Sequence, residues 1–446
     1  MNTRALCAGV LAALTVACGS SGVAKTIPAS IDPAVLSAAA SPESVGFDAE
    51  RLKLLDVYMA GVVASGRVAG MTTLLARHGK IVDFKTYGKT TLAGTRVMAP
   101  DDIFRVYSMS KPITGVAMMI LFEQGKWRLD DPVTKFVPEF ADLKVMTGVA
   151  AAGNITTEPV KRPPTMREIM SHTAGFGYGL QTDNPVDQQF RKTEVLNSTS
   201  LKQLIDRTAA IPLKFQPGTN WAYSDAVDIQ GYIVEKLTGQ PLDVFMRERI
   251  FTPLKMTDTG FIVRDGQTAR LAGLYDGFSK DGSLQETKKI FGFPLPDATK
   301  PPPYFMGGGG LVSTTMDYAR FCQMILNKGE LAGARILSPA TVELMDTNVI
   351  PRSVLVSSNG TGWDHFNEAT GFGLDFMVVN DPRKAGSLEG KNTMSWGGAA
   401  GTWFWIDPTN DVIFVGMIQR FGGVPGNDLG GIARTLTYQA LTHPEK

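Results

Sequence analysis

Hydrophobic residues follow a helical period near the start of the chain and strand-like patterns toward both of its ends. Residues 48–66 begin with polar side chains, end at a glycine and carry apolar residues at three- and four-residue spacing, which is typical of an amphipathic helix. Residues 71–76 and 81–87 are short β-rich runs around a turn that contains Gly79, which predicts a hairpin. The C-terminal part repeats this style, with strands expected at 373–379, 393–406 and 412–418 and a helix over 430–441.

The middle of the chain has helical patterns and loops rich in proline and glycine instead. Thr165 and Glu168 form a capping-box pattern for a helix that ends near His172. We therefore predict an α+β fold, in which an antiparallel sheet flanked by helices is interrupted by a mostly helical domain. The predicted divisions are an N-terminal linker at residues 18–44, a sheet domain made of residues 45–130 and 346–446, and a helical domain at residues 131–345.

Composition narrows the classes of function. The chain of 446 residues has 44 basic and 43 acidic side chains and a net charge of +1, without a basic run, so we expect no nucleic-acid partner. Its 4 histidines are scattered and lack metal-ligand neighbours at helical spacing, so neither a metal nor a cofactor is predicted. Cys322 lies in an apolar-periodic stretch and is expected to be a buried core thiol.

The first residues have the pattern of a targeting signal. Arg4 precedes an apolar run that is much too short to span a bilayer, so residues 1–17 predict an export signal. The tripeptide at residues 17–19 resembles a bacterial lipoprotein cleavage site, at which Cys18 would carry the lipid. Two alternatives stay open, a periplasmic or outer-surface protein that is free and one that is tethered through Cys18, and the oligomeric state is open as well.

One short motif could carry chemistry. Gly-x-Ser-x-Gly is absent, but Ser108 and Lys111 form a Ser-x-x-Lys motif, and Pro112 suits the first turn of a helix that Gly125 would end. Ser108 would lie at the helix N-terminus, where free N–H groups favour a developing anion, with Lys111 one turn later on the same face. These four letters alone favour a simpler interpretation, a helix cap followed by a solvent-facing lysine.

The surrounding segments change this balance. Residues 103–114, followed by residues 125–133, resemble the serine β-lactamase and penicillin-binding-protein superfamily, and within it most closely the class C β-lactamase-related carboxylesterases known as family VIII esterases. Further segments that resemble the family follow in the same chain order, at residues 171–176, 215–224, 250–261 and 309–314. The resemblance spans about residues 45–440 and implies a β-lactamase-like fold.

The resemblance also implies roles for residues of this chain. Ser108 matches the nucleophile, and Tyr223 matches a phenol that is hydrogen-bonded to Ser108 and Lys111 and relays a proton. The N–H groups of Ser108 and Ala399 would form the oxyanion hole. His172 lies in a loop common in the family and is expected to be structural. Without the motif order, Tyr223 would be interpreted as an amphipathic core tyrosine.

Two departures from the β-lactamase pattern concern the substrate. Asp225 stands where β-lactamases have an asparagine, which puts the usual contact with the substrate amide in doubt. Trp396, Gly397 and Gly398 stand where β-lactamases have Lys-Thr-Gly, so the cation that holds a drug's carboxylate is missing. The small residues would let a substrate approach the strand edge. The simpler alternative is a buried tryptophan on a tight edge strand.

Together these features predict a serine carboxylesterase that acts on short-chain neutral esters through an acyl-enzyme on Ser108. A β-lactamase or a D-amino-acid-specific peptidase is the alternative within the same class. A non-catalytic protein that binds the cell wall is the alternative from another class, and the presence of Ser108, Lys111 and Tyr223 argues against it.

Overall fold

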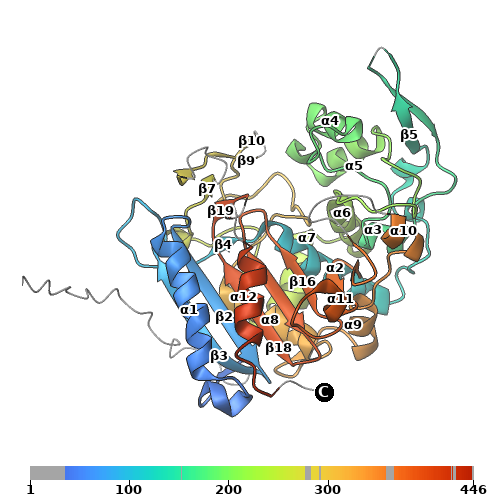
Figure 1. Ribbon diagram of the computed structural model, residues 1–446. Coiled ribbons are helices and arrows are strands. Elements are labelled where there is room, and N and C mark those ends of the chain that lie inside the picture. The colour runs from blue at the N-terminus through green and yellow to red at the C-terminus, as the bar shows by residue number, and fades with distance from the viewer. Residues whose placement is uncertain are drawn as a thin grey trace, which may run out of the picture.

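An eight-stranded sheet organises the part of the chain that the structure describes (Figure 1). The computed structural model describes residues 36–151, 153–276, 283–290, 293–357, 366–422, 424 and 428–443. Neighbouring strands of the sheet are antiparallel except for the parallel edge pair β1 and β3. In spatial order the strands are β1 (Ser37–Ala38), β3 (Lys80–Gly88), β2 (Gly70–Arg77), β18 (Val412–Met417), β17 (Trp403–Asp407), β16 (Met394–Gly397), β15 (Met377–Val379) and β14 (Thr370–Phe372).

The N- and C-terminal parts of the chain meet inside this sheet, where β2 pairs with β18. The central strands are apolar on both faces, because successive side chains point to opposite sides and both sides are covered. On β17, for example, Trp405 packs into the core on one face and Phe404 into the core on the other. This double burial explains why β17 and β18 are almost continuously hydrophobic.

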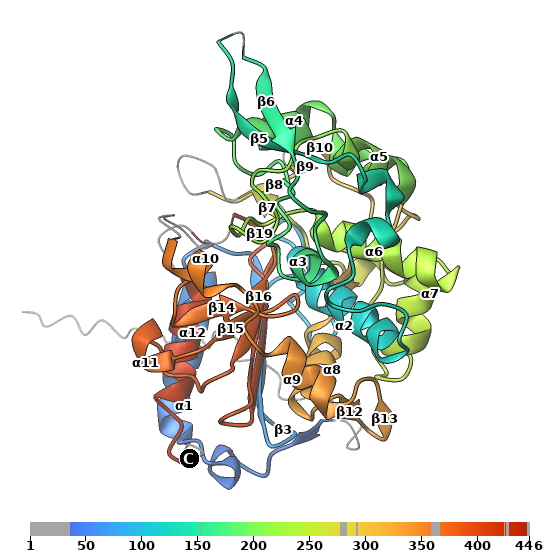
Figure 2. The same ribbon diagram turned by 90° about the vertical axis from the view of Figure 1, so that its right-hand side faces the viewer.

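Helices from distant parts of the sequence cover the two faces of the sheet (Figures 1 and 2). The first and last helices, α1 (Ala49–Ala64) and α12 (Leu429–Tyr438), pack against each other on one face. On the other face α8 (Thr315–Leu326) contacts β2, β17 and β18. The sheet is therefore a middle layer between two helical layers.

The helices α2 to α7 gather beyond α8, and a hairpin of β5 and β6 projects from this region in Figure 2. The helix α2 packs against α6, and α6 packs against α3, α5 and α7. The bounds of these and the remaining helices are α2 (Ser110–Glu123), α3 (Met166–Met170), α4 (Pro185–Lys192), α5 (Leu201–Ala209), α6 (Ala226–Thr238), α7 (Leu242–Met246), α9 (Pro339–Met345), α10 (Arg352–Ser357) and α11 (Pro382–Ala385). The short strands outside the sheet are β4 (Phe104–Arg105), β5 (Lys144–Val149), β6 (Ile155–Pro159), β7 (Tyr275–Asp276), β8 (Gln285–Glu286), β9 (Lys289–Ile290), β10 (Phe293–Pro294), β11 (Val312–Ser313), β12 (Glu330–Leu331), β13 (Ala334–Arg335) and β19 (Arg420–Phe421).

Local sequence signals account for several element ends. The carboxylate of Asp48 caps α1 by accepting a hydrogen bond from the Arg51 N–H. His78 and Gly79, the two residues of the β2–β3 turn, have φ values of 54° and 66°, the left-handed conformation that a tight hairpin turn requires. The Thr165 and Glu168 capping box is present at the start of α3.

The structure confirms the α+β architecture, the first hairpin, the first and last helices and the burial of Cys322. The predicted strand at residues 393–406 is in fact two strands, β16 and β17, joined by a turn. The expected linker contributes β1 to the sheet, and α8, from the expected helical domain, packs on it. The export signal and Cys18 lie outside the described residues, and within them no helix has the length and apolarity to cross a membrane.

Candidate active site

Ser108 lies at the junction between an edge strand and a buried helix. After β4, which pairs with β11, the chain makes one 3-10 turn at residues Tyr107–Met109 and continues directly into α2. Tyr107 takes a φ of 44°, which turns the chain sharply just before Ser108. The Ser108 side chain is half-buried, and the first turn of α2 behind it is buried.

Lys111 brings its amino group back to Ser108 from one turn further along the chain. The distance from Lys111 Nζ to Ser108 Oγ is 3.4 Å. Lys111 is only 1% exposed, and its Nζ also donates to the Tyr178 hydroxyl at 3.1 Å and to the Gly308 carbonyl at 2.6 Å. The predicted solvent-facing alternative for this lysine is therefore wrong.

The Gly307–Gly310 run forms a loop that is clamped onto the start of α2. Thr114 Oγ1 donates to the Gly307 carbonyl at 2.8 Å, and the Leu311 N–H donates to Ser110 Oγ at 3.1 Å. A Cβ at Gly307 would lie 2.8 Å from the Val227 carbonyl oxygen, so only glycine allows this close approach. The run of four glycines is the signal by which the sequence marks this close approach.

A buried carboxylate holds the same loop from the other side. Asp228, on α6, accepts a hydrogen bond from the Gly308 N–H at 2.9 Å and is fully buried. Burial raises the pKa of Asp228 to about 6, while the charge of Lys111 and the Gly308 hydrogen bond act in the opposite direction. Asp375, another buried carboxyl near Lys111, accepts a hydrogen bond from Gln230 at 3.1 Å. Nothing local in the sequence marks either of these two carboxyls as part of the site.

Tyr223 presents its ring to Lys111. Lys111 Nζ lies 4.5 Å from the centre of the Tyr223 ring, over its face, and Tyr223 itself is half-buried. Aromatic side chains surround this ring, with centroid distances of 5.5 Å to Trp396 and 5.3 Å to Tyr178. The structure therefore brings Ser108, Lys111, Tyr223 and Trp396 into one cluster.

Tyr178 is a further member of the site that the sequence did not single out. It lies six residues after His172, and its hydroxyl accepts the hydrogen bond from Lys111. Burial and the nearby negative charge of Asp228 raise the pKa of Tyr178 well above its usual value. Tyr178 therefore stays a neutral phenol, suited to orienting Lys111 rather than to accepting a proton.

The end of β16 approaches Ser108 closely. A Cβ at Gly398 would lie 2.4 Å from the Val106 carbonyl oxygen, so glycine is needed where this strand end passes the segment before Ser108. Gly397 is exposed. The Ala399 carbonyl accepts from the Gly422 N–H at 3.0 Å, whereas its own N–H has no protein acceptor among the described residues. Ala399 thus has a free donor next to the strand end that lies against Val106.

Asp225 bonds to a residue outside this cluster, whereas His172 packs against one of its members. Asp225 is fully buried and accepts a hydrogen bond from Thr208 Oγ1 at 2.8 Å. Burial raises its pKa well above the usual value, which favours a neutral carboxyl. His172 is fully buried beside the Tyr223 ring, with a centroid distance of 5.0 Å.

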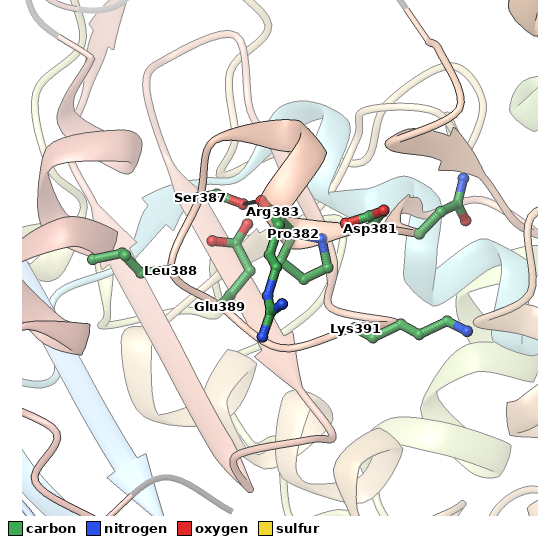
Figure 3. Close-up of a pocket in the computed structure, with 8 residues that line it drawn as sticks. Asp381, Pro382, Arg383, Ser387, Leu388, Glu389 and Lys391 are labelled. Atoms are coloured by element: carbon green, nitrogen blue, oxygen red, sulfur yellow. Dashed lines mark hydrogen bonds between the residues drawn. The ribbon is translucent and has the colours of Figure 1, made fainter. Parts of the chain in front are cut away.

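A surface hollow elsewhere is not part of this cluster (Figure 3). It lies in the segment that joins β15 to β16, at the opposite end of β16 from Trp396. Its lining residues are Asn380, Asp381, Pro382, Arg383, Ser387, Leu388, Glu389 and Lys391. Across the described ranges, no group of three or more histidine, cysteine, aspartate or glutamate side chains is placed to hold a metal ion.

The layered fold and a serine and lysine in contact at the start of a buried helix together define a serine hydrolase. The chain belongs to the Beta-lactamase family, whose model matches residues 55–439. This confirms the superfamily resemblance and the β-lactamase-like fold expected from the sequence.

Relatives include named esterases. The chain is 30% identical to Esterase EstB of Burkholderia gladioli, over 82% of this chain and 91% of EstB. It is 28% identical to the lovastatin esterase of Penicillium rubens, over 86% of this chain and 97% of that enzyme. EstCE1, described as a hydrolase with promiscuous acyltransferase activity, has a similar structure, with a TM-score of 0.71 and 25% identity over 87% of this chain and 98% of its own.

Proposed function

We propose that the protein is a serine carboxylesterase that cleaves short-chain neutral esters through an acyl-enzyme on Ser108. The observation that carries this proposal is the hydrogen bonding of Lys111. Its Nζ donates to Tyr178, to Gly308 and, at 3.4 Å, to Ser108 Oγ. The buried amino group therefore lies in direct contact with the Ser108 hydroxyl, the position from which a general base would take its proton.

The proposed reaction has two halves. In the first, Ser108 Oγ attacks the ester carbonyl, and its proton passes to the pair formed by Lys111 and Tyr223. The N–H groups of Ser108 and Ala399 stabilise the tetrahedral oxyanion, and the C–O bond breaks as the proton moves to the leaving alkoxide. In the second half, water attacks the acyl-enzyme, gives a proton to the same pair and releases the acid, and Ser108 Oγ regains its proton.

The wall around Tyr223 supports a neutral substrate. Trp396 packs against Tyr223 and lies 5.3 Å, centroid to centroid, from Phe372. This wall has apolar and aromatic surface where β-lactamases have a lysine. An ester without a carboxylate has no charge that needs this lysine as a partner, so it binds without leaving a charge unpaired. The names of the esterase relatives support cleavage of an ester.

The test is a side-by-side assay of the purified protein on p-nitrophenyl butyrate and on a chromogenic cephalosporin, with Ser108→Ala as the control. We expect ester turnover that greatly exceeds cephalosporin turnover and that disappears in Ser108→Ala. Cephalosporin turnover that exceeds ester turnover would favour the β-lactamase alternative. Folded protein that turns over neither substrate and is not labelled on Ser108 by a fluorophosphonate would favour the non-catalytic, cell-wall-binding alternative.

We also propose that the protein is exported by way of residues 1–17. Cell fractionation followed by intact-mass measurement tests this proposal and separates its two forms. A mass that corresponds to cleavage before Cys18 plus acyl chains identifies the tethered form, and an unmodified mature chain identifies the free form. Full-length protein in the cytoplasm would contradict export.

A further inference from the structure

The two neighbours of Tyr223 in the chain, Ala222 and Ser224, are both hydrogen-bonded to His172. The Ala222 N–H donates to the His172 carbonyl at 3.0 Å, and Ser224 Oγ is hydrogen-bonded to His172 Nδ1 at 2.9 Å. Tyr223 therefore lies between two residues that are each bonded to His172. Because the flanking backbone and side chain are both held, the direction in which Tyr223 points depends on His172.

The imidazole ring also contacts the Tyr223 ring directly. The two centroids are 5.0 Å apart, and His172 also packs against Trp221 and Phe372 at 5.7 and 5.5 Å. His172 Nε2 is buried and has no hydrogen-bond partner among the described residues, so this side of the ring serves as packing surface. A buried nitrogen without a hydrogen-bond partner is unfavourable for stability, so the presence of a histidine at this position calls for an explanation other than packing.

The backbone of His172 is itself constrained. Its φ of 59° is a left-handed conformation that β-branched and bulky residues rarely adopt. Burial and the charge of Lys111 lower the pKa of His172 well below its usual value, so the ring stays neutral and does not compete as a base. A neutral, fully buried ring in a constrained loop is suited to holding another side chain in place.

We infer that His172 is a positioning residue that sets the orientation of the Tyr223 phenol toward Ser108 and Lys111. This inference rests on the proposed function, because it gives His172 no contact with substrate and lets it act only through Tyr223. It follows that substitutions at this contact matter only while the Tyr223 hydroxyl is present.

A double-mutant cycle tests this dependence. His172→Asn tolerates the positive φ but removes the ring, and Ser224→Ala removes only the hydrogen bond to Nδ1. Each is measured with Tyr223 present and in the Tyr223→Phe background, which keeps the ring and deletes the hydroxyl. Ser171→Ala is the matched control, because Ser171 is buried in the same loop but bonds Thr173 instead.

With Tyr223 present, we expect each variant to lower kcat on p-nitrophenyl butyrate by about tenfold or more, with KM changed less than twofold. In the Tyr223→Phe background the same substitutions should cost less than twofold, and Ser171→Ala should be near wild type in both. Where turnover is too slow, the rate of Ser108 labelling by a fluorophosphonate replaces kcat. If His172→Asn fails to fold, the Ser224→Ala cycle decides.

Equal losses in the two backgrounds, or no loss in either variant, would overturn the role of His172. Wild type and Ser108→Ala are measured in the same series. Ester turnover that survives in Ser108→Ala would instead refute the proposed function, so the two failures are distinguishable.

Discussion

Two tyrosines contact Lys111 at the scale of single residues, and they do so in different ways. Lys111 Nζ lies over both rings, but only Tyr178 also accepts a hydrogen bond from it, whereas Tyr223 is half-buried beside Trp396. The raised pKa of Tyr178 keeps its proton in place. The phenol that exchanges protons in the reaction is therefore expected to be Tyr223.

A matched pair of substitutions separates these roles. Tyr223→Phe should lower kcat by about 100-fold or more, the usual contribution of a positioned acid or base. Tyr178→Phe removes one hydrogen bond from Lys111 and should cost about tenfold. Steady-state kinetics on p-nitrophenyl butyrate measures both, and circular dichroism checks that both variants fold. A larger loss in Tyr178→Phe than in Tyr223→Phe would assign the proton transfer to Tyr178.

At the scale of elements, the loop formed by Gly307–Gly310 sets the geometry around Lys111. It supplies the Gly308 carbonyl to Lys111 and receives Asp228 at the same residue. The loop, α2 and α6 thus form one hydrogen-bonded unit. A distortion of the loop is transmitted directly to the lysine.

Two neighbouring glycines test this coupling. A Cβ at Gly308 would lie 2.8 Å from Asp228 Oδ2 and 3.1 Å from the Tyr178 hydroxyl, whereas at Gly309 the nearest atom would be 3.7 Å away. Gly308→Ala should therefore lower kcat by about tenfold or more, because Lys111 loses its acceptor geometry. Gly309→Ala should keep most of the activity. Ester kinetics of the two variants side by side gives the answer, and equal activity would show that the loop does not hold Lys111.

A buried carboxyl in the first turn of α8 makes stability depend on pH. Asp317 accepts hydrogen bonds from the Asp258 N–H at 2.7 Å and Thr259 Oγ1 at 3.0 Å, yet burial raises its pKa from 3.8 to about 6. The unfolded chain loses this proton at lower pH than the folded chain, so stability decreases as pH rises from about 4 to about 6. The full effect is at most about 3 kcal/mol.

Asp317→Asn should remove this dependence. Relative to wild type, the free energy of unfolding of the variant should rise by about 1–3 kcal/mol between pH 4 and pH 7. Urea unfolding at each pH measures the difference. Asp131→Asn serves as a control, because hydrogen bonds from Lys135 and the Arg128 N–H outweigh burial and lower the pKa of Asp131. Its pH dependence lies below about pH 4, so its difference from wild type should stay nearly constant between pH 4 and pH 7. A constant difference between wild type and Asp317→Asn would contradict the assignment.

The elements that the sequence predicts well are those with local signals. Asp48 and the 3.6-residue period define α1, and Gly79 defines the first hairpin. The contacts of Lys111 were harder to predict, because Tyr178, Asp228 and Gly308 come from three separated segments that only tertiary packing brings together. No spacing rule connects such residues in a single sequence.

At the scale of the whole molecule, the central sheet is assembled from both ends of the chain. The pairing of β2 with β18 joins them, and buried Arg77 reinforces the junction. Arg77 donates to the carbonyls of Asn410 at 2.9 Å, Val45 at 3.0 Å and His443 at 2.8 Å. One guanidinium thus ties together the turn after β17, the segment before α1 and the residues that follow α12.

Replacing Arg77 should loosen this junction. Arg77→Leu leaves three carbonyls without their charged donor, and we expect the free energy of unfolding to fall by about 3 kcal/mol or more. Arg77→Lys keeps the charge, but a single ammonium cannot span three acceptors as the planar guanidinium does, so its loss should be intermediate. Urea unfolding followed by tryptophan fluorescence measures both, since Trp405 lies in the same core as α1 and α12. At temperatures where the variants stay folded, ester turnover should remain close to wild type, because Arg77 contacts none of Ser108, Lys111 and Tyr223. Unchanged stability in Arg77→Leu would mean that strand pairing and the apolar cores alone hold the chain ends together.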